Sequence, residues 1–82
     1  MRATVLVRPK GGILDPQGEA VERSLRQLGF PVDTARVGRL IDLEVDAPSA
    51  AEARSQLEQM CERLLANPLI ESYEIEVEET RA

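Results

Sequence analysis

Three features of this 82-residue sequence could carry chemistry: a lone thiol, a glycine-bearing loop and rows of carboxylates. Cys61 could act as a nucleophile if a neighbouring cation lowered its pKa. The loop Lys10-Gly11-Gly12 precedes a predicted helix and could bind a phosphate through backbone amides. The carboxylates of Asp42, Glu44 and Asp46 recur at every second position and could hold a cation or act as acid and base. Each of these functions also needs neighbouring groups that the sequence would have to supply.

The sequence favours a structural role for all three features. Cys61 lies between Met60 and Leu64 on a predicted apolar stripe, and no cation nearby would clearly lower its pKa, so we expect a core residue. The glycine loop is not followed by Gly-Lys-Ser/Thr, and Asp15 places a carboxylate where the phosphate would bind. The carboxylate rows have the regular spacing of a solvated strand face. We therefore expect no catalytic, cofactor-binding or metal-binding residue in this chain.

Composition narrows the function classes further. The chain has no His, so the commonest general base and metal ligand is missing. Its single Cys allows neither an intramolecular disulfide nor a multi-thiolate zinc site, which fits a reducing compartment. A net charge of −5 and 2% aromatic residues disfavour nucleic-acid and membrane binding. Without a signal peptide or a long apolar run, we expect a cytoplasmic protein whose partners are small molecules or other proteins.

Hydrophobic periodicity predicts the elements that position these residues. A β-branched, apolar run predicts a strand over residues 2–9. The first helix is predicted to begin with Asp15 as its N-cap and to end at Gly29, which suits a left-handed C′ position. Phe30 would then pack back on Leu25.

The region between the helices is predicted to be extended. Residues 41–46 alternate between apolar and acidic side chains, as expected of a strand with one buried face. Residues 32–37 predict a weaker strand. Gly38 separates the two, so the region forms either two strands or one long bent strand, and we favour two.

The second helix is predicted to begin at Ser49, whose hydroxyl would form a capping box with Glu52. Its apolar stripe consists of Ala50, Ala53, Leu57, Met60, Cys61, Leu64 and Leu65. Asn67-Pro68 ends this helix. A last alternating strand is predicted over residues 72–78, followed by a polar tail from Glu79.

This order, β-α-β(-β)-α-β, predicts one α+β domain over residues 1–82. We expect a two-layer sandwich with two helices on one face of a small, mostly antiparallel sheet, in a split-βαβ-like arrangement. The first strand carries Arg2 and Arg8 on the face where the later strands carry acidic residues. Placing it between the acidic strands would pair opposite charges, which favours a central position. The outward Leu6 and the small, aromatic-poor core favour self-association.

Two apolar segments are not explained by the predicted core. Ile13 and Leu14 lie in the glycine loop, and residues 64–73 form an apolar corner between the second helix and the last strand. Each segment could pack under its own loop, or it could anchor an interface with another protein. Both alternatives stay open at this point.

Two strings in these segments are distinctive: Gly12-Ile13-Leu14-Asp15-Pro16-Gln17-Gly18 and Leu64-Leu65-Ala66-Asn67-Pro68. Together with Lys10, Leu28-Gly29 and Val37-Gly38-Arg39, they resemble the PurS family, the small subunits of phosphoribosylformylglycinamidine (FGAM) synthase. The resemblance runs from Met1 to about Glu78. The chain departs from the family pattern at Arg39, where Lys is frequent, and at Ser72, where Asp or Asn is usual.

The resemblance implies a required subunit of a glutamine-dependent C–N ligase in purine biosynthesis. A PurL-like synthetase subunit would use ATP and Mg to activate the formyl oxygen of formylglycinamide ribonucleotide, and a PurQ-like glutaminase subunit would supply ammonia. This chain would bridge the two as a homo-oligomer, a dimer or tetramer associating through its sheets, with no catalytic residue or bound cofactor of its own. The subunit-interface residues would be Lys10, Gly12, Ile13, Leu14, Asp15, Asn67, Pro68 and Tyr73. A small-molecule (amino-acid) sensing module is the alternative function.

Overall fold

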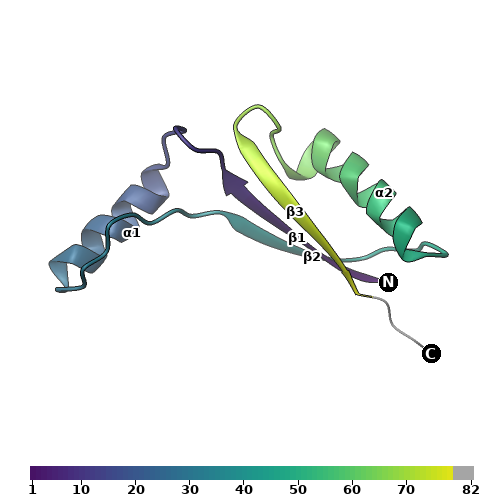
Figure 1. Ribbon diagram of the computed structural model, residues 1–82, viewed down its shortest axis with the longest axis horizontal. Coiled ribbons are helices and arrows are strands. Elements are labelled where there is room, and N and C mark those ends of the chain that lie inside the picture. The colour runs from purple at the N-terminus through teal and green to yellow at the C-terminus, as the bar shows by residue number, and fades with distance from the viewer. Residues whose placement is uncertain (79–82) are drawn as a thin grey trace.

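The computed structural model describes residues 1–78, which form a three-stranded antiparallel sheet and two helices (Figure 1). The elements are β1 (Arg2–Pro9), α1 (Pro16–Gln27), β2 (Arg39–Glu44), α2 (Ala50–Met60), the π-helix η1 (Cys61–Leu65) and β3 (Glu71–Glu78). The predicted α+β class is confirmed. The polar tail predicted from Glu79 lies outside the described residues.

β1 is the central strand, because the sheet has the order β2-β1-β3. The prediction that it lies between the two acidic strands is confirmed. Arg2 stands opposite Glu44 on one side and Glu78 on the other. Arg8 forms an ion pair of 3.0 Å with Glu74. The face that carries these charges, called the open face below, consists of Arg2, Thr4, Leu6, Arg8, Leu40, Asp42, Glu44, Ser72, Glu74, Glu76 and Glu78.

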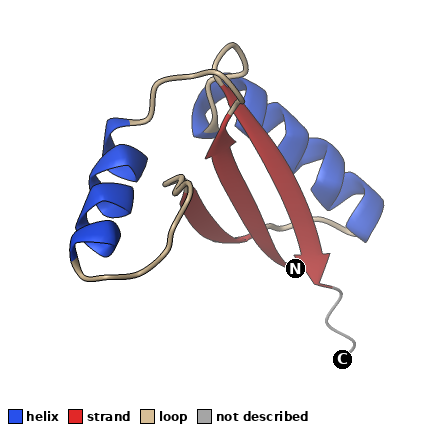
Figure 2. Ribbon diagram, turned by 60° about the vertical axis from the view of Figure 1, so that its left-hand side comes forward, coloured by secondary structure: helices blue, strands red, loops and turns tan. Residues whose placement is uncertain are grey.

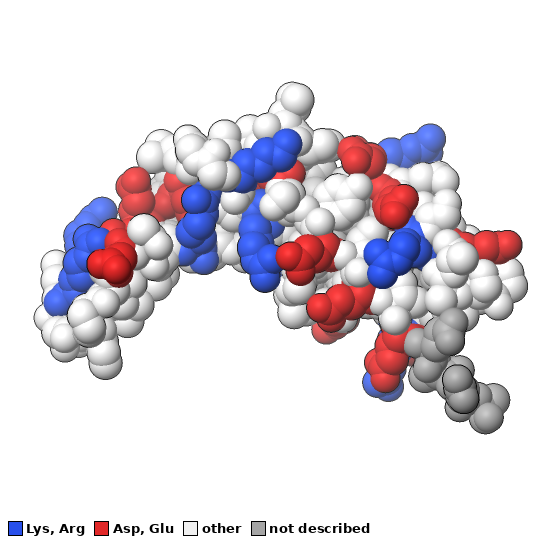
Figure 3. All heavy atoms as spheres, viewed as in Figure 1, with Lys and Arg blue, Asp and Glu red and all other residues white. Residues whose placement is uncertain are grey.

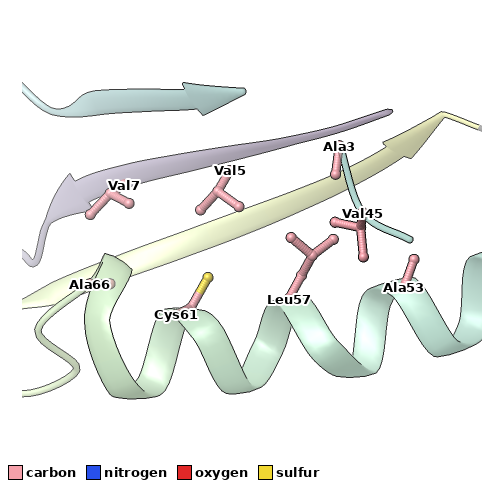
Figure 4. Close-up of a cluster of buried hydrophobic side chains, with 8 residues drawn as sticks. All are labelled: Ala3, Val5, Val7, Val45, Ala53, Leu57, Cys61 and Ala66. Carbon is pink, nitrogen blue, oxygen red and sulfur yellow. The ribbon is translucent and has the colours of Figure 1, made fainter. Parts of the chain in front are cut away.

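The opposite, inner face of the sheet holds the core. α2 and η1 run beneath β1 and β3, as Figure 4 shows. The buried side chains are Ala3, Val5, Val7, Val45, Ala53, Leu57, Cys61 and Ala66. The core therefore consists of small aliphatic side chains and one thiol. The alternation predicted for the regions of β2 and β3 is confirmed, since their apolar residues Ile41, Leu43, Tyr73, Ile75 and Val77 share this face.

The second helix changes its winding before it ends. α2 begins at the predicted N-cap, where the Ser49 hydroxyl accepts a hydrogen bond from the Glu52 amide. From Cys61 the chain continues as a π-helix, closed by a 3.0 Å bond from the Ala66 amide to the Cys61 carbonyl. A π-turn bonds i to i+5 and rotates the following side chains away from the α-helical stripe. Leu64 is consequently 83% exposed, so its predicted place in the buried stripe is wrong.

The predicted ends of the first helix are confirmed. Asp15 is the N-cap of α1, and its side chain accepts a 3.0 Å hydrogen bond from the Gly18 amide. At the other end Gly29 has a φ of 95°, which glycine adopts without strain. The amide of Phe30 then bonds back to the Leu25 carbonyl, which closes the helix.

The position of α1 differs from the expectation of two helices on one face. α1 extends away from the sheet, whereas α2 packs on it (Figures 1 and 2). The reason lies in residues 32–37, which form no strand and instead return along α1. The Val37 amide donates to the Asp15 carboxylate at 2.9 Å, and Arg26 donates to the Val32 carbonyl at 2.9 Å. Because these contacts hold the returning chain against α1, the weak strand predicted there is wrong and β2 begins only at Arg39.

Candidate functional site

The loop after β1 and the turn before β3 meet at one end of the sheet. We call residues 10–15 and 66–71 together the corner. The Lys10 amide donates to the Ile70 carbonyl at 2.9 Å, and the Lys10 ammonium donates to the Pro68 carbonyl at 2.6 Å. The structure thus joins the two segments whose apolar residues the predicted core did not explain.

The turn at the corner is held by Asn67. The Asn67 side-chain oxygen accepts a 3.2 Å bond from the Leu69 amide, and its backbone carbonyl accepts from the Ile70 amide at 3.1 Å. Pro68 has no amide hydrogen to continue the helix, so the chain turns here. The Asn67 amide donates in turn to the Glu71 carboxylate at 2.7 Å. These short-range bonds fix a tight turn whose apolar side chains point away from the core.

An ion pair fastens β2 to this turn. The Arg39 guanidinium donates to both carboxylate oxygens of Glu71, at 2.7 and 2.9 Å, and to the Leu65 carbonyl at 2.6 Å. Arg39 and the Asn67 amide hold the pKa of Glu71 below its ordinary value, and Glu71 raises the pKa of Arg39. Sequence reasoning missed this pair, because β2 and β3 are not neighbours in the sheet and nothing in the pattern links the two residues.

Large apolar side chains are exposed around the corner. The exposed fractions are 74% for Leu14, 83% for Leu64, 84% for Leu69 and 42% for Ile70. Ile13, Leu14 and Ile70 also line a surface hollow of about 260 Å³, whose polar side includes Glu71. Exposed apolar groups gathered beside fixed polar groups are typical of a protein contact surface.

Seven of the eight predicted interface residues lie at the corner: Lys10, Gly12, Ile13, Leu14, Asp15, Asn67 and Pro68. Gly12 has a φ of 83° and lets the loop turn there. Tyr73 is not among them, because it lies on the inner face, packed against the core. Its hydroxyl donates to the Glu62 carboxylate at 3.0 Å, which raises the pKa of Tyr73. Tyr73 therefore supports the turn from within the fold.

The groups that could have carried chemistry are held in structural roles. Burial raises the pKa of the Cys61 thiol, with further contributions from Glu62 and Glu58, so the nucleophilic thiolate is disfavoured. The Asp15 carboxylate occupies the amino end of α1, where a phosphate would otherwise bind. Within residues 1–78 no three His, Cys, Asp or Glu side chains converge on a possible metal position. None of the helices in that range is long and apolar enough to cross a membrane.

Comparison with known proteins identifies the family. The family model for PurS, described as phosphoribosylformylglycinamidine (FGAM) synthase, matches residues 2–79. The chain belongs to the PurS family. The resemblance drawn from the glycine-loop and helix-end motifs is confirmed.

Individual PurS proteins match over nearly the whole chain. The FGAM synthase subunit PurS of Synechocystis is 46% identical over 77 residues, covering 93% of this chain and 75% of its own length. The crystal structure of Methanocaldococcus jannaschii PurS has 37% identity and a TM-score of 0.85, with 98% of each chain covered. A PurS-like chain in the structure of PurLQS from Thermotoga maritima has 38% identity and a TM-score of 0.84, covering 92% of this chain and 93% of that chain.

Proposed function

We propose that this chain is the non-catalytic subunit of an FGAM synthase in purine biosynthesis, bridging the synthetase and glutaminase subunits. The observation that carries the proposal is the match to PurS over almost the entire chain, including a chain of the Thermotoga PurLQS structure. The structural features agree with a role in protein–protein contact. Exposed apolar groups gather at the corner, the Cys61 thiol is buried, and the Asp15 carboxylate caps α1.

A bridging subunit assists the reaction by fixing the geometry of its partners. Ammonia released by the glutaminase must reach the synthetase without escaping to solvent, and an ordered interface shortens and encloses its path. A subunit that binds only one relative arrangement of its partners shifts their equilibrium toward that arrangement. The turn held by Asn67 and the Arg39–Glu71 pair supplies a preformed surface for such binding.

The proposal includes the composition of the working complex. The chain self-associates, and the oligomer contacts a PurL-like synthetase and a PurQ-like glutaminase in the cytoplasm. ATP and Mg are used by the synthetase subunit, and this chain binds no cofactor. The small aliphatic core supports self-association, because a domain with so modest a core gains stability when further apolar surface is covered.

The corner provides the direct test. We expect the double variant Ile13→Asp/Leu14→Asp to fold but to bind the partner subunits poorly, since two charges would enter an apolar contact. Complex formation would be measured by size-exclusion chromatography with the cognate synthetase and glutaminase, and turnover by glutamine-dependent amidine formation. Both should fall by about tenfold or more.

Leu40→Asp is the matched control, because Leu40 is an apolar residue, 58% exposed, on the open face rather than at the corner. It should leave assembly and turnover near the wild-type values. Normal assembly and turnover of the double corner variant would show that the corner is not a docking surface.

A further inference from the structure

Residues 36–39, where the chain returns from α1 into β2, are bound to the first half of the corner. The Arg36 guanidinium donates to the Lys10 carbonyl at 2.8 Å, and the Val37 amide donates to the Asp15 carboxylate at 2.9 Å. Figure 3 shows Lys and Arg side chains gathered between α1 and the sheet, where this segment runs. The first loop of the corner is therefore fixed at both of its ends by the returning chain.

The same segment is bound to the second half of the corner through Arg39. Its guanidinium donates to both carboxylate oxygens of Glu71, at 2.7 and 2.9 Å, and to the Leu65 carbonyl at 2.6 Å. Leu65 ends η1 and Glu71 begins β3, so these bonds fix both ends of the turn between them. Glu71 also restrains the turn itself, because its carboxylate accepts a hydrogen bond from the Asn67 amide at 2.7 Å.

Gly38 holds this segment against β1. An added Cβ at Gly38 would lie 2.0 Å from the Val7 carbonyl oxygen, so the two backbones are in close contact. β1 is the central strand of the sheet, and the first half of the corner follows it directly. The segment 36–39 is thus packed on a strand that is hydrogen-bonded on both sides, and both halves of the corner are bound to the segment.

We infer that Arg39 is a positioning residue for partner docking, which fixes the two halves of the corner relative to each other without contacting the partner itself. This inference rests on the proposed function and specifies how its docking surface is held. Leu14 on the first half and Leu69 on the second are 74% and 84% exposed, so packing in the core does not fix them. A surface built from two loops binds more tightly when the loops are ordered before binding, because ordering them on binding costs free energy.

The bonds of Arg39 suit it to hold the corner in place. Both terminal nitrogens of its guanidinium already donate within the chain, to Glu71 and to the Leu65 carbonyl. A bidentate pair of this kind fixes the relative orientation of its two groups. The Leu65 carbonyl is one of those that a helix end leaves without a partner in the helix. Lys10 also links the two halves, but its ammonium is a point donor on a flexible side chain.

The test compares partner binding by Arg39→Met and Arg54→Met, two variants that each remove one guanidinium. Arg54 is the matched control, because it also donates to the β3 region, to the Ile75 carbonyl at 3.0 Å, but lies on α2 outside the corner. Affinity for the cognate synthetase and glutaminase would be measured by biolayer interferometry on full chains that circular dichroism shows to be folded. Arg39→Met should weaken binding to at least one partner by about tenfold, and Arg54→Met by less than about twofold.

Further variants distinguish positioning from direct contact. Because Arg39 and Glu71 act through one pair, Arg39→Met/Glu71→Gln should bind no more weakly than Arg39→Met alone. Arg39→Lys keeps a charge beside Glu71 and should recover part of the lost affinity. Glu71→Gln preserves the shape of the side chain and should weaken binding in the same direction, so it tests the inference even if Arg39→Met does not fold.

Hydrogen exchange on the free chain gives a readout that general destabilisation does not imitate. The amides of Leu69 and Ile70, both bonded to Asn67, should exchange faster in Arg39→Met, while those of β1 keep their wild-type rates. Wild-type affinity of Arg39→Met and of Glu71→Gln for both partners would overturn the inference. Losses that add in the double variant, or exchange that is equally faster in β1, would overturn it too. A wild-type chain that binds neither partner would instead contradict the proposed function, and the inference with it.

Discussion

A few single residues determine how α1 and the segment that returns along it leave the sheet; we call residues 16–37 together the arm. Asp15 caps α1 through the Gly18 amide and also accepts a hydrogen bond from the Val37 amide, joining the start of the helix to the chain that returns from it. Both bonds lower the pKa of Asp15, that of Val37 most. The Asp15 carboxylate was predicted to be the N-cap because Asp15 directly precedes Pro16. Its second bond was not predicted, because Val37 lies 22 residues away in a segment that was expected to form a weak strand.

Asp15 should make the stability of the chain depend on pH. Its folded pKa lies below the ordinary value, so its stabilising contribution is complete above the unfolded pKa of about 4 and is lost as pH falls through the lower folded pKa. Asp15→Asn removes this titration. In urea denaturation the gap in stability between wild type and variant should be largest near neutral pH and should shrink below about pH 4. An equal gap at pH 3 and pH 7 would contradict this role.

Gly38 should tolerate no side chain. A Cβ there would lie 2.0 Å from the Val7 carbonyl oxygen, a backbone atom that cannot move aside without disturbing β1. We expect Gly38→Ala to lower the free energy of unfolding by about 1–3 kcal/mol. Gly11→Ala is the control, since nothing lies within 4 Å of the added Cβ, and its effect should stay within about 0.5 kcal/mol. Equal denaturation midpoints for the two variants would show that the close approach does not matter.

Among the helices and strands, the elements set by neighbouring residues were predicted correctly. The features that depend on contacts between distant residues were not all predicted. β1, both caps and the alternation of β3 follow from residues adjacent in sequence. The strand order was predicted from the arginines of β1 between two acidic strands, which is a tertiary inference from charge. The outward position of α1 was not predicted, because it depends on bonds between the arm and the end of β1, such as those of Arg36.

The π-turn separates two leucines that helical spacing places together. Leu57 is completely buried in α2, whereas Leu64 in η1 is 83% exposed. Leu57→Ala should therefore cost about 2–5 kcal/mol. Leu64→Ala should change stability by no more than about 0.5 kcal/mol. Chemical denaturation at one fixed protein concentration measures both, and similar costs for the two variants would contradict the rotation of the stripe at Cys61.

The molecule as a whole is elongated. The part of the chain that the structure describes measures 49 × 29 × 14 Å and has a radius of gyration of 16.1 Å. A compact domain of this length would have about 12 Å. The excess comes from the arm, which carries apolar surface away from the sheet, while the corner presents further apolar groups. The family resemblance predicted interface residues at the corner, whereas the separation of α1 from the sheet was not predicted.

In the proposed function, this chain assembles and couples two enzymes without performing catalysis itself. The most direct measurement is glutamine-dependent amidine formation by the cognate synthetase and glutaminase subunits, with and without this chain, and ammonia-dependent formation as the control. We predict that omission abolishes most of the glutamine-dependent activity, that adding the purified chain restores it, and that the chain alone has none. Full glutamine-dependent activity of the two enzymes without this chain would contradict the proposed bridging role.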